Sequence, residues 1–394
     1  MTTRKKTKYP VTVLHLLPEL ERGGAEVLAT SIARFLPRDR FTPLLATLSD
    51  RTPLVEDLDR QGIEHLLAEP RGPFDFSGAA LDEILIERQV AILHTHLPRA
   101  DWAGASAVAR LEKNGKTPPL LVQTRHNTSH FRGARRVTLL VDRRRAERAC
   151  RILPVSPVVR DELLSLRIAP EEKIVTVPNG VDLERIDAVR GKTRDEHRAA
   201  LAAELGIDPG DSLLLCVASL TEQKGHEVLL EAFASVVERH PEARLLLAGQ
   251  GPLQRRIDRQ AKKLSITERV HFLGSRSDVP ALLAAADVAV QPSLWEGFGL
   301  AAAEALAAGL PTVVSRTGGL VDIVRDGETG LLVSPGSPEP LAHALHHMLG
   351  HPEEAAEMGR RASEDVRRRF PLSKTIERLT AIYEEILESP ATAQ

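Results

Sequence analysis

The sequence has few aromatic residues, few cysteines and no long apolar run. Aromatic side chains make up 3% of the 394 residues, so stacking platforms for single-stranded nucleic acid are not expected. The two cysteines, Cys150 and Cys216, stand far apart in the chain, which leaves no readable disulfide framework or cysteine zinc site and indicates a reducing compartment. No apolar stretch approaches the roughly 18 residues of a membrane-spanning helix. We therefore expect a cytoplasmic protein, with any membrane contact peripheral.

An excess of charge of either sign is also missing. Lys and Arg number 52 against 54 Asp and Glu, for a formal net charge of -2. This balance argues against a dedicated nucleic-acid binder, so no nucleic-acid partner is expected. The 42% hydrophobic and 27% charged residues are ordinary for a globular protein. At roughly 100–200 residues per domain, the length predicts two or three domains.

Short apolar runs alternate with longer amphipathic stretches along nearly the whole chain. Most runs are continuous Val, Ile and Leu without polar alternation, which is typical of parallel strands covered by helices on both faces. This alternation predicts a doubly wound α/β fold. The expected strands are 11–17, 43–48, 90–93, 120–123, 152–155 and 174–177, then 213–217, 244–248, 270–273, 288–291, 311–314 and 331–333.

The halves of the chain open alike, with a strand, a loop and a glycine at a helix start. Pro178 and Asn179-Gly180 interrupt the pattern, and a charged stretch follows. We therefore predict two Rossmann-like domains, 1–185 and 186–375. Residues 376–394 are expected to form a C-terminal helix and tail that could pack back on the first domain.

The most informative segment covers residues 291–305. It follows an expected buried strand, turns at Gly297 and Gly299, and then opens an alanine-rich helix. A glycine turn that opens a helix aims free backbone N–H groups outward, where an anionic phosphate can bind. Glu296 lies before that helix and Glu304 lies inside it. Because carboxylates accept hydrogen bonds from hydroxyls, the two suit a polyhydroxylated ligand.

The pair Glu296-x7-Glu304 resembles the E-x7-E signature of retaining glycosyltransferases of the family-4 type. That family has the GT-B fold, an α/β architecture in which two Rossmann-like doubly wound domains face each other across a cleft. Further motifs, in order, carry the resemblance over most of the chain. They are 18–26, 94–96, 124–126, 155–156, 177–182, 224–226, 248–252, 272–274, 317–319 and 326–330.

The resemblance implies a retaining glycosyltransferase that moves a sugar from a nucleotide-diphosphate donor to a glycan, lipid-linked or small-molecule acceptor. Surface polysaccharide or lipopolysaccharide assembly is the setting it implies. It gives catalytic roles to Glu296 on the sugar hydroxyls, His126 near the transferred sugar, and Lys224 on the diphosphate. No metal or cofactor is expected, because Lys224 and helix-start amides can stabilise the departing diphosphate. The implied donor-binding residues are Glu304, on the ribose, with Gly297, Phe298, Gly299, Leu300, Gly24, Gly274 and Arg276.

One position departs from the family pattern. Where the family has an Arg five positions before the Lys, this chain has Ser219. Loss of one charge-assisted hydrogen bond, about 1.5–3 kcal/mol, would weaken donor binding roughly ten- to a hundred-fold. Two alternatives stay open. The first is a nucleotide-sugar epimerase or phosphorylase on the same fold. The second, which the missing Arg motivates, is a non-catalytic glycosyltransferase-like protein that binds a nucleotide sugar or a partner.

Histidines and arginines of the first half allow two further interpretations. His94 and His96 alternate, and His126 and His130 are four apart, but no carboxylate or cysteine completes a metal set, so we expect polar cleft residues. The arginines between 132 and 151 form either a solvated helix face or a basic patch for anionic lipid headgroups or a phosphorylated acceptor. That patch would consist of Arg132, Arg135, Arg136, Arg143, Arg144 and Arg145.

Overall fold

The computed structural model describes residues 9–21, 23–50, 58–59, 61–68, 79–127, 136–189 and 191–388. The chain forms two compact units, and each is considered by itself. Unit 1 is Met1–Gly180 with Leu372–Gln394, and unit 2 is Val181–Pro371. The chain passes between the units a few residues before the predicted 185 and 375, and its last helix belongs to unit 1.

Unit 1 is built on a parallel sheet of order β3-β2-β1-β4-β5-β6. Strand β1 pairs with both β2 and β4. The strands from β1 to β3 therefore extend the sheet toward one edge, and those from β4 to β6 extend it toward the other. Its elements are β1 (Val11–Leu17), α1 (Gly24–Phe35), β2 (Phe41–Thr47), β3 (Glu64–Leu67), α3 (Ala79–Glu87), β4 (Val90–His96), α4 (Pro98–Lys113), β5 (Leu120–Arg125), α5 (Arg136–Arg148), β6 (Arg151–Pro154), α6 (Pro157–Ser165), the 3-10 turn η2 (Glu171–Lys173) and α16 (Leu372–Glu388).

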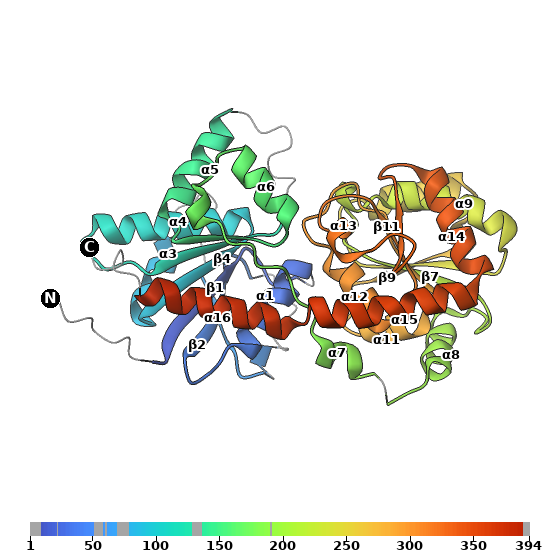
Figure 1. The fold of residues 1–394 in the computed structure, drawn as a ribbon, viewed down its shortest axis with the longest axis horizontal. Helices are drawn as coiled ribbons and strands as arrows, with labels where there is room; N and C mark the ends of the chain where they lie inside the picture. The colour runs from blue at the N-terminus through green and yellow to red at the C-terminus, as the bar shows by residue number, and fades with distance from the viewer. Residues whose placement is uncertain are drawn as a thin grey trace. The chain divides into compact units, whose positions relative to one another are not determined.

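Helices cover both faces of the unit 1 sheet. Gly104 of α4 lies against Thr95 and Leu93, on one face of β4. The alternate residue His94 faces the other way, where its ring contacts Tyr383 of α16. Figure 1 shows α16, drawn in red, beside the strands of unit 1. The terminal helix thus completes the second helical layer of this unit.

Unit 2 repeats the architecture with sheet order β12-β11-β10-β7-β8-β9, again parallel. In Figure 1, α9 and α14 lie on one side of this sheet, with α11, α12 and α15 on the other. Its elements are α7 (Leu183–Asp187), α8 (Arg194–Leu205), β7 (Ser212–Val217), η3 (Glu222–Lys224), α9 (His226–Arg239), β8 (Ala243–Ala248), α10 (Gln254–Lys263), η4 (Thr267–Arg269), β9 (Val270–Gly274), α11 (Val279–Ala285), β10 (Val288–Gln291), α12 (Leu300–Ala308), β11 (Thr312–Ser315), α13 (Leu320–Ile323), β12 (Leu331–Val333), α14 (Pro338–Gly350) and α15 (Pro352–Arg369).

Local sequence explains these elements. Leu214 and Leu246 of the unit 2 strands are fully buried, because helices cover both faces of a parallel sheet. Helix α9 turns Leu229, Phe233 and Val236 into the core at helical spacing. Helix α8 begins with a capping box at Thr193 and ends at a left-handed glycine.

One strand prediction was wrong, and one strand was not predicted. Residues 174–177 do run beside β6, where Val175 N–H donates to the carbonyl of Ile152 over 3.0 Å, but they form only an isolated bridge. Strand β3 escaped prediction because, as a short strand at the sheet edge, it keeps Glu64 exposed and has no apolar run.

A buried charge cluster ties α4 and α5 to the sheet of unit 1. The guanidinium of Arg125 lies 3.3 Å from Asp101 and 3.2 Å from Asp142. Burial raises the pKa of Asp101 to about 6, and the neighbouring Arg125 opposes that rise. The cluster links the end of β5 to both helices.

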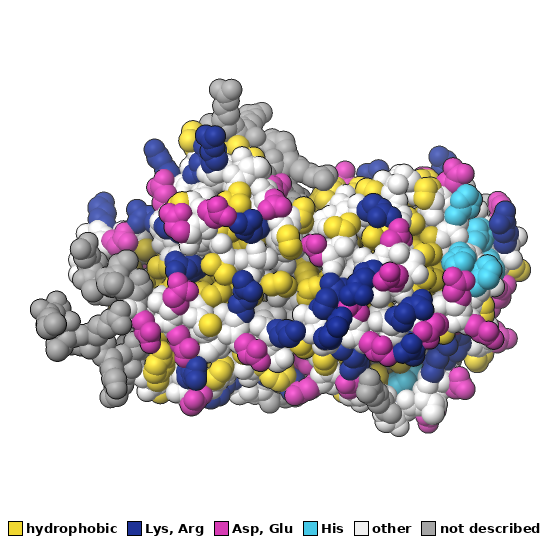
Figure 2. All heavy atoms as spheres, viewed as in Figure 1, with side chains coloured by type: hydrophobic (Ala, Val, Ile, Leu, Met, Phe, Trp, Pro, Cys, Tyr) yellow, Lys and Arg dark blue, Asp and Glu magenta, His cyan; other side chains and the backbone are white. Residues whose placement is uncertain are grey.

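The face drawn in Figure 2 carries charges of both signs. Lys and Arg side chains are interspersed with Asp and Glu on the face drawn in Figure 2, in keeping with the net charge of -2. Over the residues described, no helix combines the length and apolar character needed to cross a bilayer.

Candidate functional site at the switch point of unit 2

The sheet order of unit 2 identifies one position suited to a ligand. Strands β7, β8 and β9 follow one another to one edge, whereas β10, β11 and β12 follow one another to the other. The carboxyl ends of β7 and β10 therefore flank a topological switch point, where open α/β sheets bind their ligands. Lys224 follows β7, and Glu296 follows β10.

The loops that follow these two strands are joined by their backbones. Leu294 N–H donates to the carbonyl of Gln223 over 2.7 Å. Gly225 has a φ of +64°, and a Cβ at that position would lie 2.1 Å from the carbonyl oxygen of Pro292. A glycine is needed here for both its left-handed backbone and the close approach. The contact fixes Lys224 beside the β10 loop.

Lys224 and Glu296 form an ion pair at the switch point. The Lys224 Nζ lies 2.5 Å from Glu296 Oε2, which also accepts from the Ser293 hydroxyl over 3.2 Å. The other oxygen, Oε1, accepts from the Gly297 N–H over 3.3 Å. Gln291 donates to Ser293 over 3.1 Å. The Glu296 side chain is only 9% exposed, so these donors stabilise a charge that burial alone would disfavour.

A third loop, after β11, packs against the backbone of the loop that carries Glu296. A Cβ on Gly318 would lie 1.7 Å from the Glu296 carbonyl oxygen, and one on Gly319 would lie 2.5 Å from that of Gly297. Gly318 has a φ of +52°. The Thr317-Gly318-Gly319 motif therefore serves a backbone-to-backbone contact that side chains would block.

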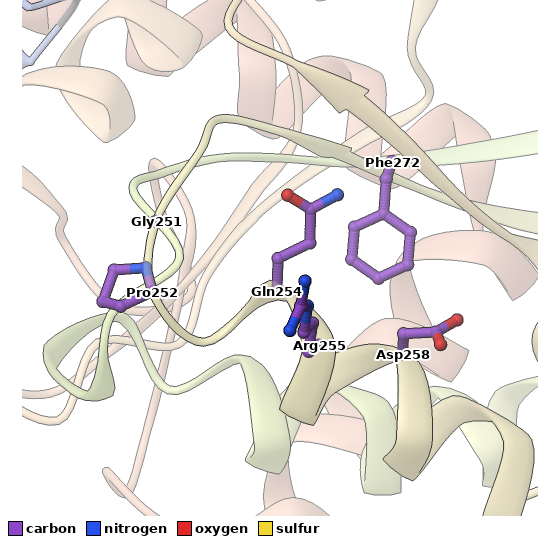
Figure 3. A pocket seen from close by; sticks show the side chains of 6 residues that line it. All are labelled: Gly251, Pro252, Gln254, Arg255, Asp258 and Phe272. Carbon is purple, nitrogen blue, oxygen red and sulfur yellow. The ribbon is translucent and has the colours of Figure 1, made fainter.

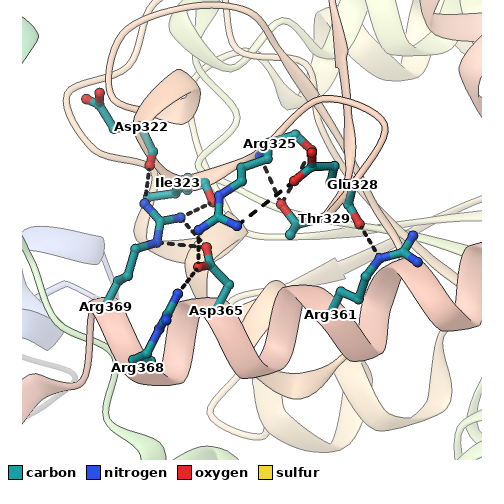
Figure 4. Close-up of polar contacts among 9 residues, drawn as sticks. All are labelled: Asp322, Ile323, Arg325, Glu328, Thr329, Arg361, Asp365, Arg368 and Arg369. Carbon is teal, nitrogen blue, oxygen red and sulfur yellow. Dashed lines mark hydrogen bonds and ion pairs between the residues drawn. The ribbon is translucent and has the colours of Figure 1, made fainter.

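The segment after this glycine loop is anchored to α15 (Figure 4). Asp365 is 5% exposed in its side chain and pairs with Arg325 over 2.5 Å and with Arg369. Arg369 also donates to the carbonyls of Asp322 and Ile323 over 2.7 and 3.0 Å. The Asp365 cluster thereby holds α13 and the following turn, and with them the glycine loop against Glu296.

Helix α12 begins directly after the carboxylate loop. Gly299, with a φ of +96°, is its N-cap and supplies no side-chain cap. The first N–H groups of α12, from Leu300 onward, therefore have no partner within the helix, as at every α-helix start. Their partial positive charge adds to that of Lys224. The buried Phe298 packs edge-on against Phe370 with ring centroids 5.5 Å apart.

Glu304 lies one turn into α12 and contacts Arg185. The Arg185 Nη1 donates to Glu304 Oε1 over 3.2 Å. Burial raises the pKa of Glu304, and the Arg185 charge opposes that rise. Arg185 is positioned by α7, whose N-cap Asp182 accepts from the Arg185 backbone N–H over 3.1 Å.

The remaining donor-side residues lie at the ends of β8 and β9. The Gly249 N–H donates to the Gly274 carbonyl over 2.7 Å, joining the two loops. Arg276 is held by Asp278, at 2.8 Å and 2.7 Å, and by Glu204. Ser219 is exposed and contacts Thr221 over 3.4 Å. Arg276 could have supplied the cation that position 219 lacks, but it is paired with these two acids instead.

A hollow of about 650 Å³ borders these loops (Figure 3). Gln254, Arg255 and Asp258 come from α10, and Phe272 comes from β9. A Cβ on Gly251, at its rim, would meet the Leu220 carbonyl at 2.5 Å. The hollow therefore adjoins the loop between Ser219 and Lys224. It is lined by Gly251, Pro252, Gln254, Arg255, Asp258 and Phe272.

Gly24 and His126, the remaining predicted site residues, belong to unit 1. Gly24 begins α1 just after β1, the strand at the switch point of that sheet. The neighbouring Glu26 is buried, which raises its pKa to about 7. His126 directly follows β5, and its Nε2 lies 3.1 Å from Nδ1 of His96. Both predicted residues thus stand at the carboxyl edge of the unit 1 sheet.

Of the six arginines in the predicted basic patch, the structure describes the side chains of Arg143, Arg144 and Arg145. His130, Arg132 and Arg135 lie outside the described residues, as does the side chain of Arg136. Arg143 donates to the Leu166 carbonyl over 2.7 Å, and Arg145 lies over the Trp102 ring at 5.5 Å. Arg144 is exposed, next to the exposed Leu140 and Val141 of the same helix.

Sequence reasoning missed the partners of the predicted residues. Arg185 stands 119 positions from Glu304, and no motif connects them. Ser293 and Gln291 were inside the quoted motif, and their hydroxyl and amide beside a strand end were a usable signal. His96 was expected as a cleft residue, but His15 had no signal except its type, because only the sheet register brings it toward His96.

Two doubly wound parallel units, with an ion pair and a helix start at the switch point of the second, define a two-domain α/β protein with the GT-B fold. Residues 22–185 match the family model described as Glycosyltransferase Family 4, and residues 197–365 match that of Glycosyl transferases group 1. The chain belongs to this glycosyltransferase family.

Individual relatives agree with the family assignment. A D-inositol 3-phosphate glycosyltransferase of Saccharomonospora viridis is 31% identical over 375 residues, covering 87% of this chain and 84% of that protein. An uncharacterised glycosyltransferase of Methanocaldococcus jannaschii is 32% identical over 203 residues, 51% of each chain. The chain spans about half the length of the first curated relatives that it matches. The crystal structure of Anabaena HepE in complex with UDP and glucose has a TM-score of 0.83, with 21% identity over 95% of this chain and 100% of that one.

Proposed function

We propose that the protein is a retaining glycosyltransferase that transfers a sugar from a nucleotide-diphosphate donor to a hydroxyl acceptor. The observation that carries the proposal is the Lys224–Glu296 pair beside the start of α12, at the switch point of unit 2. Two relatives lend support. One is the family member from Saccharomonospora viridis, whose name gives D-inositol 3-phosphate as its substrate, and the other is Anabaena HepE, which was crystallised with UDP-glucose.

In this proposal the diphosphate binds at the start of α12. The N–H groups of Gly299 and Leu300 and the ammonium of Lys224 stabilise the negative charge that grows as the bond between the anomeric carbon and the phosphate oxygen breaks. The acceptor oxygen bonds to the same face of the anomeric carbon, and its proton passes to the departing phosphate. The sugar is oxocarbenium-like at the transition state. Glu296 and His126 orient its hydroxyls.

Lys224 has two roles in this scheme. Without a donor it neutralises Glu296, and with a donor its remaining N–H bonds reach the diphosphate. Ser293 and the Gly297 N–H keep the carboxylate hydrogen-bonded while the sugar hydroxyls approach. The site is thus assembled before the donor arrives, which reduces the reorganisation needed during the reaction.

Glu304 binds the ribose hydroxyls of the donor in this proposal. When ionised, a carboxylate is an acceptor only, with both oxygens available to hydroxyl donors, and burial opposes ionisation here. Arg185 counters that effect from 3.2 Å away. Arg185 is therefore a positioning residue for the ribose subsite.

A metal ion and an organic cofactor play no part in the proposed reaction. Lys224 and the α12 amides supply the positive charge that a divalent cation would otherwise provide. Donor binding and turnover in EDTA test this point directly. Restoration of activity only by Mg²⁺ or Mn²⁺ would contradict it.

We place the reaction in the cytoplasm, in surface polysaccharide or lipopolysaccharide assembly, with an optional peripheral membrane contact through α5. Arg144, Leu140 and Val141 are exposed there, a combination suited to anionic headgroups. Vesicle co-sedimentation with and without anionic lipid, comparing wild type with Arg144→Glu, tests the contact. Equal sedimentation of both proteins would contradict the proposed membrane contact.

The donor is identified by thermal unfolding in EDTA with UDP, GDP, ADP or dTDP and their common sugars. A ligand at about 100 times its Kd stabilises the folded protein by about 2.7 kcal/mol. One nucleotide should stabilise the wild type and fail with Glu304→Ala. Glu339→Ala, which changes an exposed first-turn glutamate of α14, is the matched control and should behave like wild type.

Product analysis separates the proposal from its alternatives. A retaining transferase releases the nucleoside diphosphate, joins the sugar to the acceptor with the donor's anomeric configuration, and loses this activity in Glu296→Gln. A changed nucleotide sugar with no acceptor requirement identifies an epimerase, and dependence on inorganic phosphate identifies a phosphorylase. Donor binding without turnover over a broad acceptor panel would favour the non-catalytic alternative suggested by Ser219.

A further inference from the structure

Four histidines of unit 1 lie together at the carboxyl edge of its sheet. His15 on β1 is the register partner of His94 on β4, and His96 is two residues further along. His96 pairs in turn with Thr124 of β5, two residues before His126. Because side chains two apart on a strand share a face, all four rings project from the same face. His15, His94 and His96 are fully buried.

Three of these rings form a continuous hydrogen-bonded chain, which we term the histidine chain: His15, His96 and His126. The Nδ1 of His15 lies 3.1 Å from Nε2 of His96, and the Nδ1 of His96 lies 3.1 Å from Nε2 of His126. His94 is a side branch that contacts Tyr383 and Thr124 instead, over 2.5 and 2.7 Å.

His15, at the inner end of the histidine chain, sets the direction in which hydrogen bonds are donated along the chain. A neutral imidazole has one N–H donor and one lone pair, and burial lowers the pKa of both His15 and His96 far enough to keep them neutral. His15 Nε2 is buried and has no hydrogen-bond partner in the described part of the chain. A proton on that nitrogen would be an orphaned N–H, which folded proteins avoid more strictly than an unfilled acceptor.

The remaining assignment follows ring by ring. With Nε2 of His15 unprotonated, its proton is on Nδ1 and is donated to Nε2 of His96. The proton of His96 is then on Nδ1 and is donated to Nε2 of His126. Nε2 of His126 is then the acceptor, and the proton of this ring is on Nδ1, since the hydrogen bond made by one ring nitrogen sets the state of the other.

We propose that His15 and His96 are positioning residues that hold His126 as its Nδ1–H tautomer, so that His126 acts as a hydrogen-bond donor and never as the base of the reaction. The tautomer follows from the unit 1 structure alone, whereas its catalytic use rests on the function proposed above. With Nε2 committed to His96, His126 orients a sugar hydroxyl through Nδ1–H. The acceptor proton must then go elsewhere, as in the scheme where the departing phosphate receives it.

A metal site is the competing interpretation of the same residues. One ring nitrogen from each of His15, His94 and His96 lies within 4.8 Å of the others. A metal ion needs a lone pair from each ligand, yet hydrogen bonds engage both nitrogens of His94 and of His96. No carboxylate joins this set among the described residues to neutralise a buried divalent charge. The hydrogen-bonded chain accounts for the geometry without a metal.

Nitrogen-15 NMR of the histidine rings in the full-length protein tests the proposal without any substrate. The chain has 14 histidines, and the His126 signals are assigned as those missing in His126→Gln. We expect a single His126 tautomer in the wild type, with the proton on Nδ1. In His96→Phe, the signals should move toward the average of the two tautomers. His65→Gln, which removes a half-buried histidine bonded to Thr47, should leave them unchanged.

Two results would overturn the assignment. The first is a wild-type His126 with its proton on Nε2, and this result does not depend on whether His96→Phe folds. The second is a joint shift of the His15, His94 and His96 signals at one equivalent of Zn²⁺, which would establish the metal site instead. Failure of nucleotides to bind unit 2 would refute the proposed function but leave the tautomer result standing.

Discussion

Replacing Lys224 by methionine should destabilise unit 2 because it leaves the Glu296 carboxylate buried with fewer donors. The pair is short, at 2.5 Å, and the Lys224 and Glu296 side chains are 19% and 9% exposed. Breaking a fully buried pair costs about 3–5 kcal/mol. Ser293 and the Gly297 N–H remain as donors, so we expect a loss of about 2–3 kcal/mol. For a unit of this size that corresponds to a Tm decrease of about 4–12 °C.

A double-mutant cycle isolates the contribution of the pair. Glu296→Gln alone should cost about 1 kcal/mol, because the partly exposed Lys224 can turn to water. The combination Lys224→Met with Glu296→Gln removes both charges, so it should cost less than the sum of the single changes. We expect a coupling energy of about 1.5–2 kcal/mol, within the usual range for directly paired residues.

The assay is urea unfolding followed by tryptophan fluorescence. The protein has two tryptophans, Trp102 in unit 1 and Trp295 beside the carboxylate in unit 2. A Trp102→Phe background makes the signal specific for unit 2. Lys262→Met is the control, because its pair with Asp258 is exposed and should be worth less than about 1 kcal/mol. Additive single changes in the cycle, or a loss no larger than that of the control, would refute the reasoning.

Three further predictions test other parts of the structure. Burial, together with the nearby Lys224 charge, lowers the pKa of His226 to about 4; stability should therefore fall as the pH drops below about 6.5, and His226→Gln should reduce the loss between pH 7.5 and 5.0 by about 2 kcal/mol. Arg125→Met leaves two buried aspartates unpaired and should cost about 3–5 kcal/mol in urea unfolding, whereas a loss below about 1 kcal/mol would contradict the cluster. Gly318→Ala should cost about 3 kcal/mol or more and lower donor affinity, because its Cβ would clash with backbone. Gly327→Ala has a similar positive φ with open space around it, and should lose only about 1 kcal/mol.

Much of the fold was predictable because its signals are local. Continuous apolar runs mark the buried strands whatever their neighbours are, so β7, β8 and β10 were located to within a residue or so. Strand β3 was not predicted, and 174–177 was wrongly predicted to be a strand. Both depend on the neighbouring strand, which the local sequence does not identify. The return of α16 to unit 1 likewise depends on its apolar contacts, such as Tyr383 against Phe41.

The site divides in the same manner. The motif from Gln291 to Glu304 was readable because a strand end, two glycines and a helix start are consecutive in the chain. The pairings were not readable, since Lys224, itself a predicted site residue, lies 72 positions from Glu296, and in unit 1 His15 lies 81 positions from His96. The Ser219 departure was plain in the sequence, yet only the contacts of Arg276 with Glu204 and Asp278 show that this arginine is committed elsewhere.

By itself, the sequence determined the class of fold, the two-domain organisation and the residues whose chemistry suits a sugar and a phosphate. The fold class and the two domains follow from periodicity and residue type, which act over a few positions, and the site residues follow from these together with the family resemblance. Tertiary structure alone decided which charges neutralise each other, which glycines sit where a side chain would strike backbone, and how the histidine chain is directed. Those outcomes depend on strand order and register, because burial and Coulomb interactions act through space between segments that the chain keeps far apart.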